Sequence, residues 1–261
     1  MKLSSANINV MIKVCRKAAK ILIRDFGEIE KLQVSVKGPG DFVTVSDKKA
    51  EKILIEELIK ARPTYSILSE EAGEIKNDEE FKWIIDPIDG TSNFLHGIPH
   101  FGISIGLEQN KEIICGIIFD PIKNEVFVGE KGNGSYLNNQ RMRVSSRSKL
   151  KDCIIFTGGP KYNSEDRDLA INEYKKFSSK AHTPIRKLGS AALDMAYVAA
   201  GRCDGFWQRN LNYWDIAAGI ILVKEAGGYV TDFKGKGEYI ENRTILVTNS
   251  RINEEMMEVL K

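Results

Sequence analysis

The sequence has only four cysteines in 261 residues, and their arrangement lacks the usual pattern of a disulfide framework or a zinc site. Cys15, Cys115, Cys153 and Cys203 stand alone, without a Cys-x-x-Cys pair or a Cys/His cluster. Structural zinc sites need such clusters, and dense disulfides belong to short secreted chains. Because each cysteine lies in an apolar segment, we expect four buried, reduced thiols.

The chain also lacks a long hydrophobic run and an excess of charge of either sign. No apolar stretch reaches the roughly 18 residues of a membrane-spanning helix. Basic residues interrupt the N-terminal segment every few positions, unlike a secretory signal peptide. Lys plus Arg number 38 and Asp plus Glu 36, so no global field attracts nucleic acid or an acidic membrane. We therefore expect a cytoplasmic protein with no membrane partner, whose charge-dependent functions are local.

The first half of the chain contains helical and then strand-like patterns. Apolar residues at helical spacing predict helices over 5 to 26 and 47 to 61. Between them VSVKGPGDFVTVSD, residues 34 to 47, is typical of a β-hairpin with a Gly-Pro-Gly turn. Short β-branched runs from 65 to 130 predict one sheet, mostly antiparallel because tight turns such as Asn110-Lys111 separate the runs.

The second half alternates strand and helix, a pattern that packs helices on a sheet. The predicted strands are 153–157, 183–187, 204–208, 229–232 and 243–247, and the predicted helices are 164–178, 190–200, 214–226 and 252–260. A polar, basic stretch at 141 to 151 separates the two halves. We therefore expect an N-terminal α+β lobe (1–140) and a C-terminal α/β lobe (151–261) that together form one catalytic unit.

The stretch WIIDPIDGTSNF, residues 83 to 94, places two acids at the end of a strand and small residues directly after them. Pro87 fixes its own φ, so the chain turns there and Asp86 and Asp89 can point the same way. Gly90-Thr91-Ser92 is typical of a helix N-terminus, whose free N–H groups favour an anion. Carboxylates repel an anion unless a cation lies between them, and Mg²⁺ prefers carboxylate and phosphate oxygens. The stretch therefore indicates a magnesium and phosphate site.

A near-copy of this stretch provides an internal comparison. IIFDPIKNEVF, residues 117 to 127, repeats Asp-Pro-Ile after a similar apolar run but continues with Lys-Asn, without a second acid or a glycine at those positions. For a single Asp-Pro the simpler interpretation is a strand end or helix cap, so we expect Asp120 to form only a hairpin turn.

Three further acids could reach the same place. Glu70 follows the strand YSILS, Asp47 begins the helix at 47 to 61, and Asp215 begins the apolar helix WDIAAGIILVKEAGG. Acids in the first turn of a helix commonly stabilise its N-terminus, so capping is the alternative interpretation for Asp47 and Asp215. Sequence spacing alone does not show that these acids converge.

The sequence resembles the inositol monophosphatase family over essentially its whole length. The motifs that carry the resemblance are DFVTVSD, SEEAG, WIIDPIDGTSNF, GSAALDMAYVAAGRCDGFW and NYWDIAAGIILVKEAGG. The resemblance implies an α/β fold, a five-layered α-β-α-β-α sandwich. It also implies a Mg²⁺-dependent phosphomonoesterase that converts inositol 1-phosphate and water to inositol and phosphate.

The resemblance also assigns roles to residues by their motif positions. Glu70, Asp86 and the backbone carbonyl of Ile88 would hold a first Mg²⁺, and Asp86, Asp89 and Asp215 a second, with a weaker third near Glu70. Asp47 and Thr91, with Glu70, would act in catalysis by polarising the attacking water. The residues that would contact phosphate or substrate are Asp89, Gly90, Thr91, Gly189, Ser190, Ala191, Gln208 and Asp215.

The chain departs from the family pattern at Gln208, where an acid usually accepts from the substrate hydroxyls. An amide accepts through its oxygen but carries no charge and presents an NH₂ group. Beside Arg209, it could weaken inositol binding or favour a substrate with another anionic group, such as fructose 1,6-bisphosphate. The alternative is a modest loss without a change of substrate.

A regulatory role linked to RNA or transcription belongs to a different class of function, and some bacterial members of the family have one. The basic residues that could serve it are Arg141, Arg143, Arg147, Lys149 and Lys151. Without interleaved aromatics, such a run is more typical of a solvated edge. The resemblance also implies a homodimer and inhibition by lithium.

Overall fold

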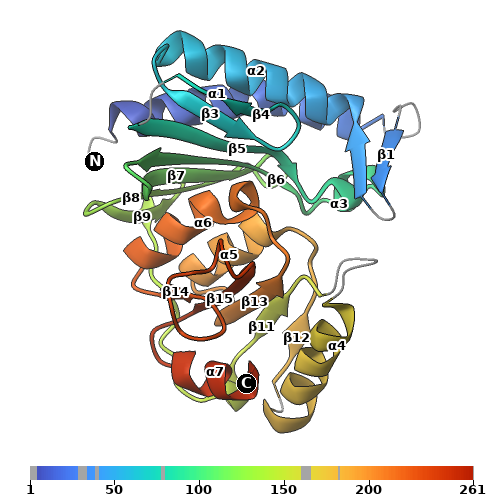
Figure 1. The fold of residues 1–261 in the computed structure, drawn as a ribbon, viewed down its shortest axis with the longest axis vertical. Coiled ribbons are helices and arrows are strands. Elements are labelled where there is room, and N and C mark those ends of the chain that lie inside the picture. The colour runs from blue at the N-terminus through green and yellow to red at the C-terminus, as the bar shows by residue number, and fades with distance from the viewer. Residues whose placement is uncertain are drawn as a thin grey trace.

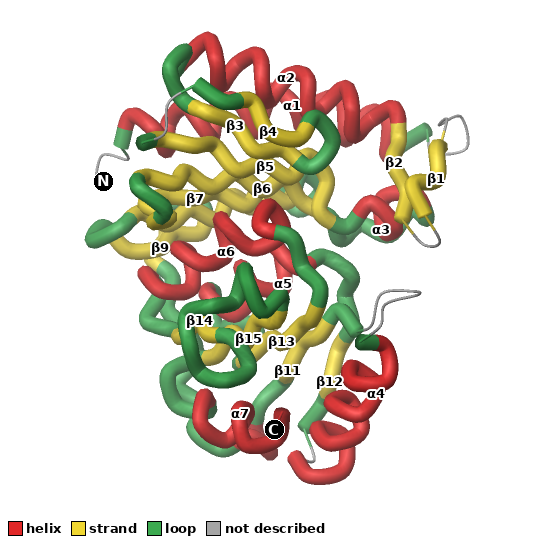
Figure 2. The backbone as a smooth tube through the Cα atoms, viewed as in Figure 1, coloured by secondary structure: helices red, strands yellow, loops and turns green. Residues whose placement is uncertain are grey.

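Two β-sheets and three layers of helices alternate through the molecule (Figure 1). This arrangement comes from a computed structural model that describes residues 5–28, 34–38, 41–77, 80–159, 166–181 and 183–260. The helices are α1 (Ala6–Phe26), α2 (Val45–Ala61), α3 (Thr91–Leu95), α4 (Arg167–Lys176), α5 (Ala191–Ala199), α6 (Tyr213–Glu225) and α7 (Asn253–Leu260). The helices α1 and α2 cover one sheet, α5 and α6 lie between the sheets, and α4 and α7 cover the other (Figures 1 and 2). The predicted five-layered sandwich is confirmed.

The first sheet has eight strands in the order β10-β9-β8-β7-β6-β5-β3-β4. Their bounds are β3 (Ser66–Ser69), β4 (Gly73–Ile75), β5 (Phe81–Asp89), β6 (Gly102–Gln109), β7 (Glu112–Asp120), β8 (Glu125–Glu130), β9 (Gly134–Leu137) and β10 (Gln140–Arg141). Only β3 and β5 pair in parallel, so the mostly antiparallel prediction is confirmed. The strand β4 was not predicted, because three residues are too short for an alternating pattern.

The predicted N-terminal hairpin is present as the antiparallel pair β1 (Val34–Gly38) and β2 (Asp41–Thr44). Its turn at Pro39-Gly40 lies outside the described residues. The predicted tight turn between β6 and β7 is confirmed, since Asn110 and Lys111 have φ angles of 51° and 65°.

The second sheet has five strands in the order β12-β11-β13-β15-β14. Their bounds are β11 (Ile155–Thr157), β12 (Ile185–Arg186), β13 (Gly205–Arg209), β14 (Tyr229–Thr231) and β15 (Thr244–Thr248). The strand predicted from residue 153 begins later, because Cys153 N–H donates to Leu150 O at 3.0 Å and closes a turn. The start of the helix predicted over 164–178 lies outside the described residues, and α4 continues as a π-helical turn at Phe177–Ala181.

Each face of the eight-stranded sheet is buried. Along β5, Trp83 and Ile85 pack in the core beneath α1 and α2, whereas Ile84 packs in the core around α5 and α6. This alternation follows from the two-residue period of a strand. All four cysteines are buried and free, as predicted. Among the helices that the structure describes, none combines the length and hydropathy of a membrane-spanning segment.

A row of three glycines lets α6 approach the first sheet closely. Gly106, Gly116 and Gly129 are register partners on β6, β7 and β8, and we call them the glycine row. A Cβ at these positions would lie 3.0 Å from Ala217 Cβ, 2.8 Å from Ala218 Cα and 3.0 Å from Leu222 Cα, respectively. The glycine row therefore sets the distance between the sheet and the helix that carries Asp215.

We expect Gly116→Ala to destabilise the protein by about 1–3 kcal/mol, because the added methyl group would press on the backbone of α6. The measurement is thermal denaturation, which should show a Tm several degrees below that of the wild type. Gly237→Ala is the control, since no atom lies within 4 Å of a Cβ at that position. Equal Tm values for Gly116→Ala and the wild type would show that α6 does not depend on this contact.

Candidate metal centre

Three buried carboxylates from separate parts of the chain converge between the first sheet and α6. Asp86 and Asp89 come from the end of β5, and Asp215 from the first turn of α6. One carboxylate oxygen from each lies within 4.8 Å of the other two. Convergence, which the sequence spacing could not show, is therefore present in the structure.

A bulge in β5 directs Asp86 and Asp89 to the same place. Asp86 pairs with Ser104 and Asp89 with Gly102, so β5 has one more residue than β6 between these pairs. Residues three apart on a regular strand point to opposite faces, and one extra residue removes that difference. Within the turn, Ile88 N–H donates to Asp86 Oδ1 at 3.0 Å.

The beginning of α5 holds the Asp89 carboxylate. The Ser190 hydroxyl and the Ala192 N–H, the latter at 2.7 Å, both donate to Asp89 Oδ2. Ser190 is also the N-cap of α5, where its side chain accepts from Leu193 N–H. The Gly189-Ser190-Ala191 turn therefore orients an acid of the cluster, which the sequence analysis did not foresee.

Asp215 caps its own helix as well as joining the cluster. Its Oδ2 accepts from Asn212 N–H at 2.7 Å, and the two residues form a capping box. The capping interpretation of this acid is thus correct, and it is compatible with a place in the cluster, since a carboxylate has further lone pairs.

Asp47, Ile88 and Thr91 meet beside the three acids. The Thr91 Oγ1 lies 2.9 Å from the Ile88 carbonyl oxygen and 3.3 Å from Asp47 Oδ1. Asp47 stands in the first turn of α2, as predicted, and is buried. Gly90 adopts a φ of 97° ahead of α3, and a Cβ there would lie 3.2 Å from two carbonyl oxygens. That backbone position therefore requires glycine.

Glu70 stands at the end of β3, close to the cluster but outside the group of three. Its neighbourhood depends on Glu51, a buried acid of α2 that the sequence analysis missed. Glu51 Oε1 accepts from the Ser69 hydroxyl and, at 3.0 Å each, from the N–H groups of Glu71 and Ala72. Glu51 lies on the same face of α2 as the buried Leu54 and Leu58, and this spacing in the sequence could have indicated a buried acid.

The clustered acids cannot all ionise easily without a cation. Burial, followed by the charges of Glu70, Asp89 and Asp215, raises the pKa of Asp86 well above its usual value. Burial also raises the pKa of Asp89 to about 6, although its hydrogen bonds from Ser190 and Ala192 act to lower it. Buried, mutually repelling oxygen donors fit a hard divalent cation such as Mg²⁺.

Gln208 lies near the end of β13. The positive charge of the next residue, Arg209, is paired with an acid. Arg209 Nε donates to Glu173 Oε1 at 2.6 Å, and the guanidinium lies 4.9 Å from the centre of the Phe233 ring. Gln208 itself packs against Gly158 and borders a cavity of about 320 Å³. Arg209 is therefore already paired with Glu173, a partner that the sequence analysis did not identify.

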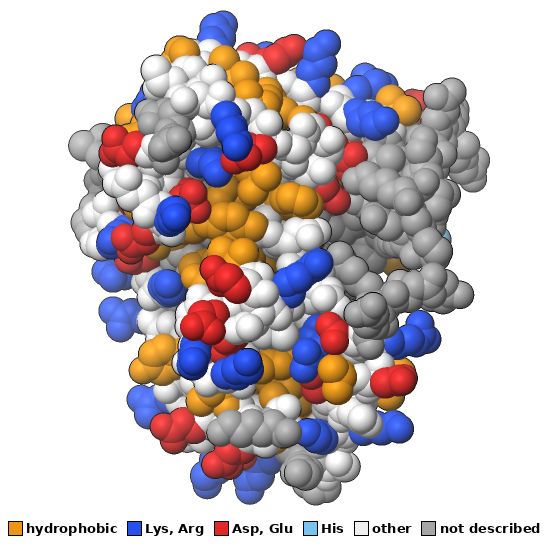
Figure 3. Space-filling view, in the orientation of Figure 1, with side chains coloured by type: hydrophobic (Ala, Val, Ile, Leu, Met, Phe, Trp, Pro, Cys, Tyr) orange, Lys and Arg blue, Asp and Glu red, His pale blue; other side chains and the backbone are white. Residues whose placement is uncertain are grey.

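The basic stretch at 141 to 151 is an exposed edge in the structure, with all five basic residues exposed. Arg147 Nη1 lies 3.0 Å from the buried carboxylate of Asp204, so the positive charge of Arg147 is paired within the fold. On the face shown in Figure 3, basic and acidic side chains are interspersed. The exposure of the five basic residues agrees with the predicted solvated edge.

Comparison with known proteins relates the chain to one family. The sequence model of the Inositol monophosphatase family matches residues 5–261. Inositol-1-monophosphatase of Rhizobium meliloti (strain 1021) is 48% identical over 258 residues, covering 98% of this chain and 97% of that protein. Nus factor SuhB of Xylella fastidiosa (strain Temecula1 / ATCC 700964) is 42% identical over 87% of this chain and 82% of that protein.

A solved structure gives the same result for the fold. The extragenic suppressor protein suhB from Bartonella henselae superposes with a TM-score of 0.95 at 47% identity, covering 98% of this chain and 99% of that chain. The family match, the full-length relatives and the shared fold agree: the chain belongs to the inositol monophosphatase family of phosphatases.

Proposed function

We propose that the protein is a Mg²⁺-dependent phosphomonoesterase that hydrolyses inositol monophosphate to inositol and phosphate. The observation that carries the proposal is the convergence of Asp86, Asp89 and Asp215 as buried oxygen donors. Membership of the family and the relative named Inositol-1-monophosphatase support the substrate class.

Two to three Mg²⁺ per subunit are part of this proposal. Glu70, Asp86 and the Ile88 carbonyl would hold one ion, and Asp86, Asp89 and Asp215 a second. When bound, such ions screen the phosphate charge, lower the pKa of water and stabilise the leaving oxygen. Phosphate monoesters hydrolyse very slowly without a catalyst, so the site must lower a large activation barrier.

The chain's own groups would orient the water and the phosphate. The contact between Thr91 Oγ1 and Asp47 Oδ1 supports a role for this pair in orienting water and receiving its proton. The N–H groups of Gly90 and Thr91 begin α3, where backbone donors lack intrahelical partners and can bind phosphate oxygens. Water would displace the alkoxide in line, without a phosphorylated side chain.

On the substrate side, Gly189, Ser190, Ala191 and Gln208 would contact the polyol hydroxyls. Asp89 and Asp215 would also face the substrate from the cluster. Of these residues, Gln208 borders the cavity of about 320 Å³. We further propose that residues 1–140 and 151–261 form one catalytic unit, because the clustered acids come from both parts.

A panel of phosphomonoesters assayed with and without Mg²⁺ tests the function. We expect phosphate release from inositol 1-phosphate to stop with a chelator and to return with Mg²⁺. Asp89→Asn should lower kcat by about 100-fold or more, because the second ion loses a charged ligand. Asp120→Asn, in the near-copy of the motif, is the matched control and should keep kcat within about threefold. Full activity of Asp89→Asn, or a trapped phosphorylated side chain, would contradict the mechanism.

The raised pKa of Asp89 predicts how stability depends on pH when a chelator removes the metal. The folded protein binds this proton more tightly than the unfolded chain, so the free energy of unfolding falls as pH rises from about 4 to about 6. In Asp89→Asn this contribution is absent. At pH 7 with a chelator, we expect the variant to be more stable than the wild type by about 3 kcal/mol, measured by denaturant unfolding. A stability difference that is the same at pH 4 and pH 7 would contradict this prediction.

Gln208→Glu tests the substrate side. A charged acceptor binds hydroxyl donors more strongly and repels a second anionic group, so kcat/KM should rise about threefold or more for inositol 1-phosphate relative to fructose 1,6-bisphosphate. Gln140→Glu, on the exposed strand β10, is the control and should leave this ratio unchanged. If Gln208→Glu also leaves it unchanged, Gln208 does not determine specificity.

The alternative substrate is another small sugar phosphate such as fructose 1,6-bisphosphate, which the same panel includes. An additional role with RNA or the transcription machinery is supported by the relative named Nus factor SuhB, although the exposed basic edge is partly neutralised by Asp204. A cytoplasmic homodimer that lithium inhibits completes the proposal, and it rests on the family resemblance alone.

A further inference from the structure

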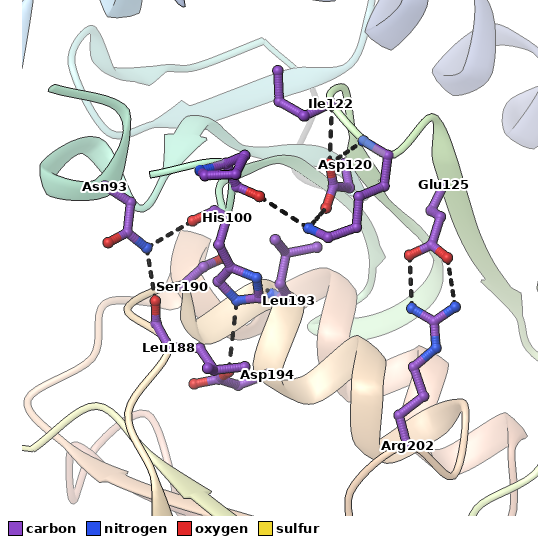
Figure 4. Close-up of polar contacts among 12 residues, drawn as sticks. Asn93, His100, Asp120, Ile122, Glu125, Leu188, Ser190, Leu193, Asp194 and Arg202 are labelled. Carbon is purple, nitrogen blue, oxygen red and sulfur yellow. Dashed lines mark hydrogen bonds and ion pairs between the residues drawn. The ribbon is translucent and has the colours of Figure 1, made fainter. Parts of the chain in front are cut away.

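A largely buried histidine and a buried aspartate face each other beside the start of α5, too far apart for a direct hydrogen bond (Figure 4). His100 lies just before β6, and Asp194 lies in the first half of α5. His100 Nε2 is 3.9 Å from Asp194 Oδ1, and the side chains are only 12% and 1% exposed. Within the part of the chain that the structure describes, neither this nitrogen nor either Asp194 oxygen has a hydrogen-bond partner.

Other fully buried aspartates of the described chain have several donors. Asp120 accepts from two backbone N–H groups and a lysine, and Asp204 from a serine, an arginine and a backbone N–H. Asp232 likewise accepts from two backbone N–H groups and an asparagine. A buried polar group without a partner costs about 1–3 kcal/mol. Asp194 is therefore an exception among these aspartates, because it lacks hydrogen-bond donors. A residue with a purely structural role would not need to be an unpaired buried acid.

The two side chains are matched as donor and acceptor. Burial, and secondly the charge of Asp89, raises the pKa of Asp194 well above its usual value. Burial, and secondly the charge of Lys123, lowers the pKa of His100 to about 4, against an opposing effect of Asp120. These pKa shifts favour a protonated Asp194 and a neutral His100, so that one side chain can donate and the other can accept. A side-chain rotation that shortens the 3.9 Å separation by about 1 Å completes the hydrogen bond.

His100 belongs to the segment that supports the Gly90 turn. Asn93 Nδ2 donates at 2.7 Å to the carbonyl oxygens of His100 and Leu188 (Figure 4). A Cβ at Gly90 would lie 3.2 Å from the carbonyl oxygens of His100 and Gly189, so these backbones are in close contact. Any movement of the His100 loop therefore reaches the turn that follows Asp89.

Asp194 belongs to the segment that holds Asp89 from the other side. Its N–H donates at 2.9 Å to Ser190 O, in the first turn of α5. The Ser190 hydroxyl and the Ala192 N–H are the donors to Asp89 Oδ2. His100 and Asp194 thus lie on the two segments whose relative position determines where the Asp89 carboxylate points.

We propose that His100 and Asp194 form a hydrogen-bonded positioning pair that fixes the start of α5 against the Gly90 turn and so orients Asp89 for Mg²⁺. The inference rests on the proposed function, since it concerns the same metal centre. Groups that orient a metal ligand, without touching the ion, typically contribute 10–100-fold to metal affinity.

The double variant His100→Phe/Asp194→Leu separates positioning from stability. Both replacements fill the space with apolar groups and remove the unpaired polar atoms, so Tm in a chelator should equal or exceed that of the wild type. Mg²⁺ binding, measured by titration calorimetry, should nevertheless weaken about tenfold. Asp194→Asn should bind Mg²⁺ within about threefold of the wild type, because its amide still donates to the imidazole.

Arg202→Met is the matched control. Arg202, in the turn after α5, donates from Nη1 to Glu125 of β8 at 2.7 Å, a contact outside the support of Asp89 (Figure 4). This variant should lower Tm and leave the Mg²⁺ Kd within twofold.

If the double variant binds Mg²⁺ with the same Kd as the wild type, the positioning pair is overturned. The proposed function is not affected by that result as long as the wild type binds Mg²⁺ measurably. No Mg²⁺ binding by the wild type overturns both. If the double variant does not fold, His100→Phe alone decides, with a weakened Mg²⁺ Kd supporting the pair and an unchanged one overturning it.

Discussion

The metal centre depends on how closely α6 approaches the eight-stranded sheet. The glycine row removes the side chains of three neighbouring strands where α6 crosses them, so the helix backbone lies close to β6, β7 and β8 there. Asp215 begins this helix, while Asp86 and Asp89 end a strand of the same sheet. The separation of helix and strand therefore sets the separation of the acids, although no glycine of the row touches them.

The second helix of the middle layer extends this constraint. Met195 of α5 packs over Gly219 of α6, where a Cβ would lie 2.6 Å from the Met195 sulfur. The start of α5 also holds Asp89 through Ser190 and Ala192. The packing of α5 on α6 therefore links the position of Asp89 to that of Asp215. The cluster itself is electrostatically unfavourable in a buried place. The large apolar cores on both faces of the first sheet offset that cost, so the stability of the fold and the chemistry of the site come from different residues.

Much of this arrangement could be predicted from the sequence, because strong local patterns determine it. Helical periodicity located α1 and α2, and the contrast between the two Asp-Pro-Ile stretches correctly assigned Asp120 to a turn. In both stretches the aspartate accepts from the N–H two residues later, at 3.0 Å. The local turn is therefore shared, and the surroundings of the second carboxylate oxygen differ: Lys123 Nζ bonds Asp120, whereas further acids surround Asp86.

The site features that the sequence did not reveal depend mostly on contacts between distant segments. Glu51 reaches across from α2 to the end of β3, and the Ser190 hydroxyl reaches Asp89, 101 positions earlier in the chain. The bulge in β5 is a difference in residue count between two strands, which neither strand shows alone. His100 and Asp194 carry no motif either, since their significance is the lack of partners around them.

The protons held by the clustered acids have a consequence for how the site exchanges with the solution. A carboxyl group must release its proton before it can bind a cation well. With the pKa of Asp89 raised to about 6 and that of Asp86 raised by burial and by its neighbours, each ion that binds below neutral pH would displace hydrogen ions into the buffer. The heat of metal uptake would therefore include the ionisation heat of the buffer. Acidity and metal concentration would act on this cluster as opposite sides of a single equilibrium.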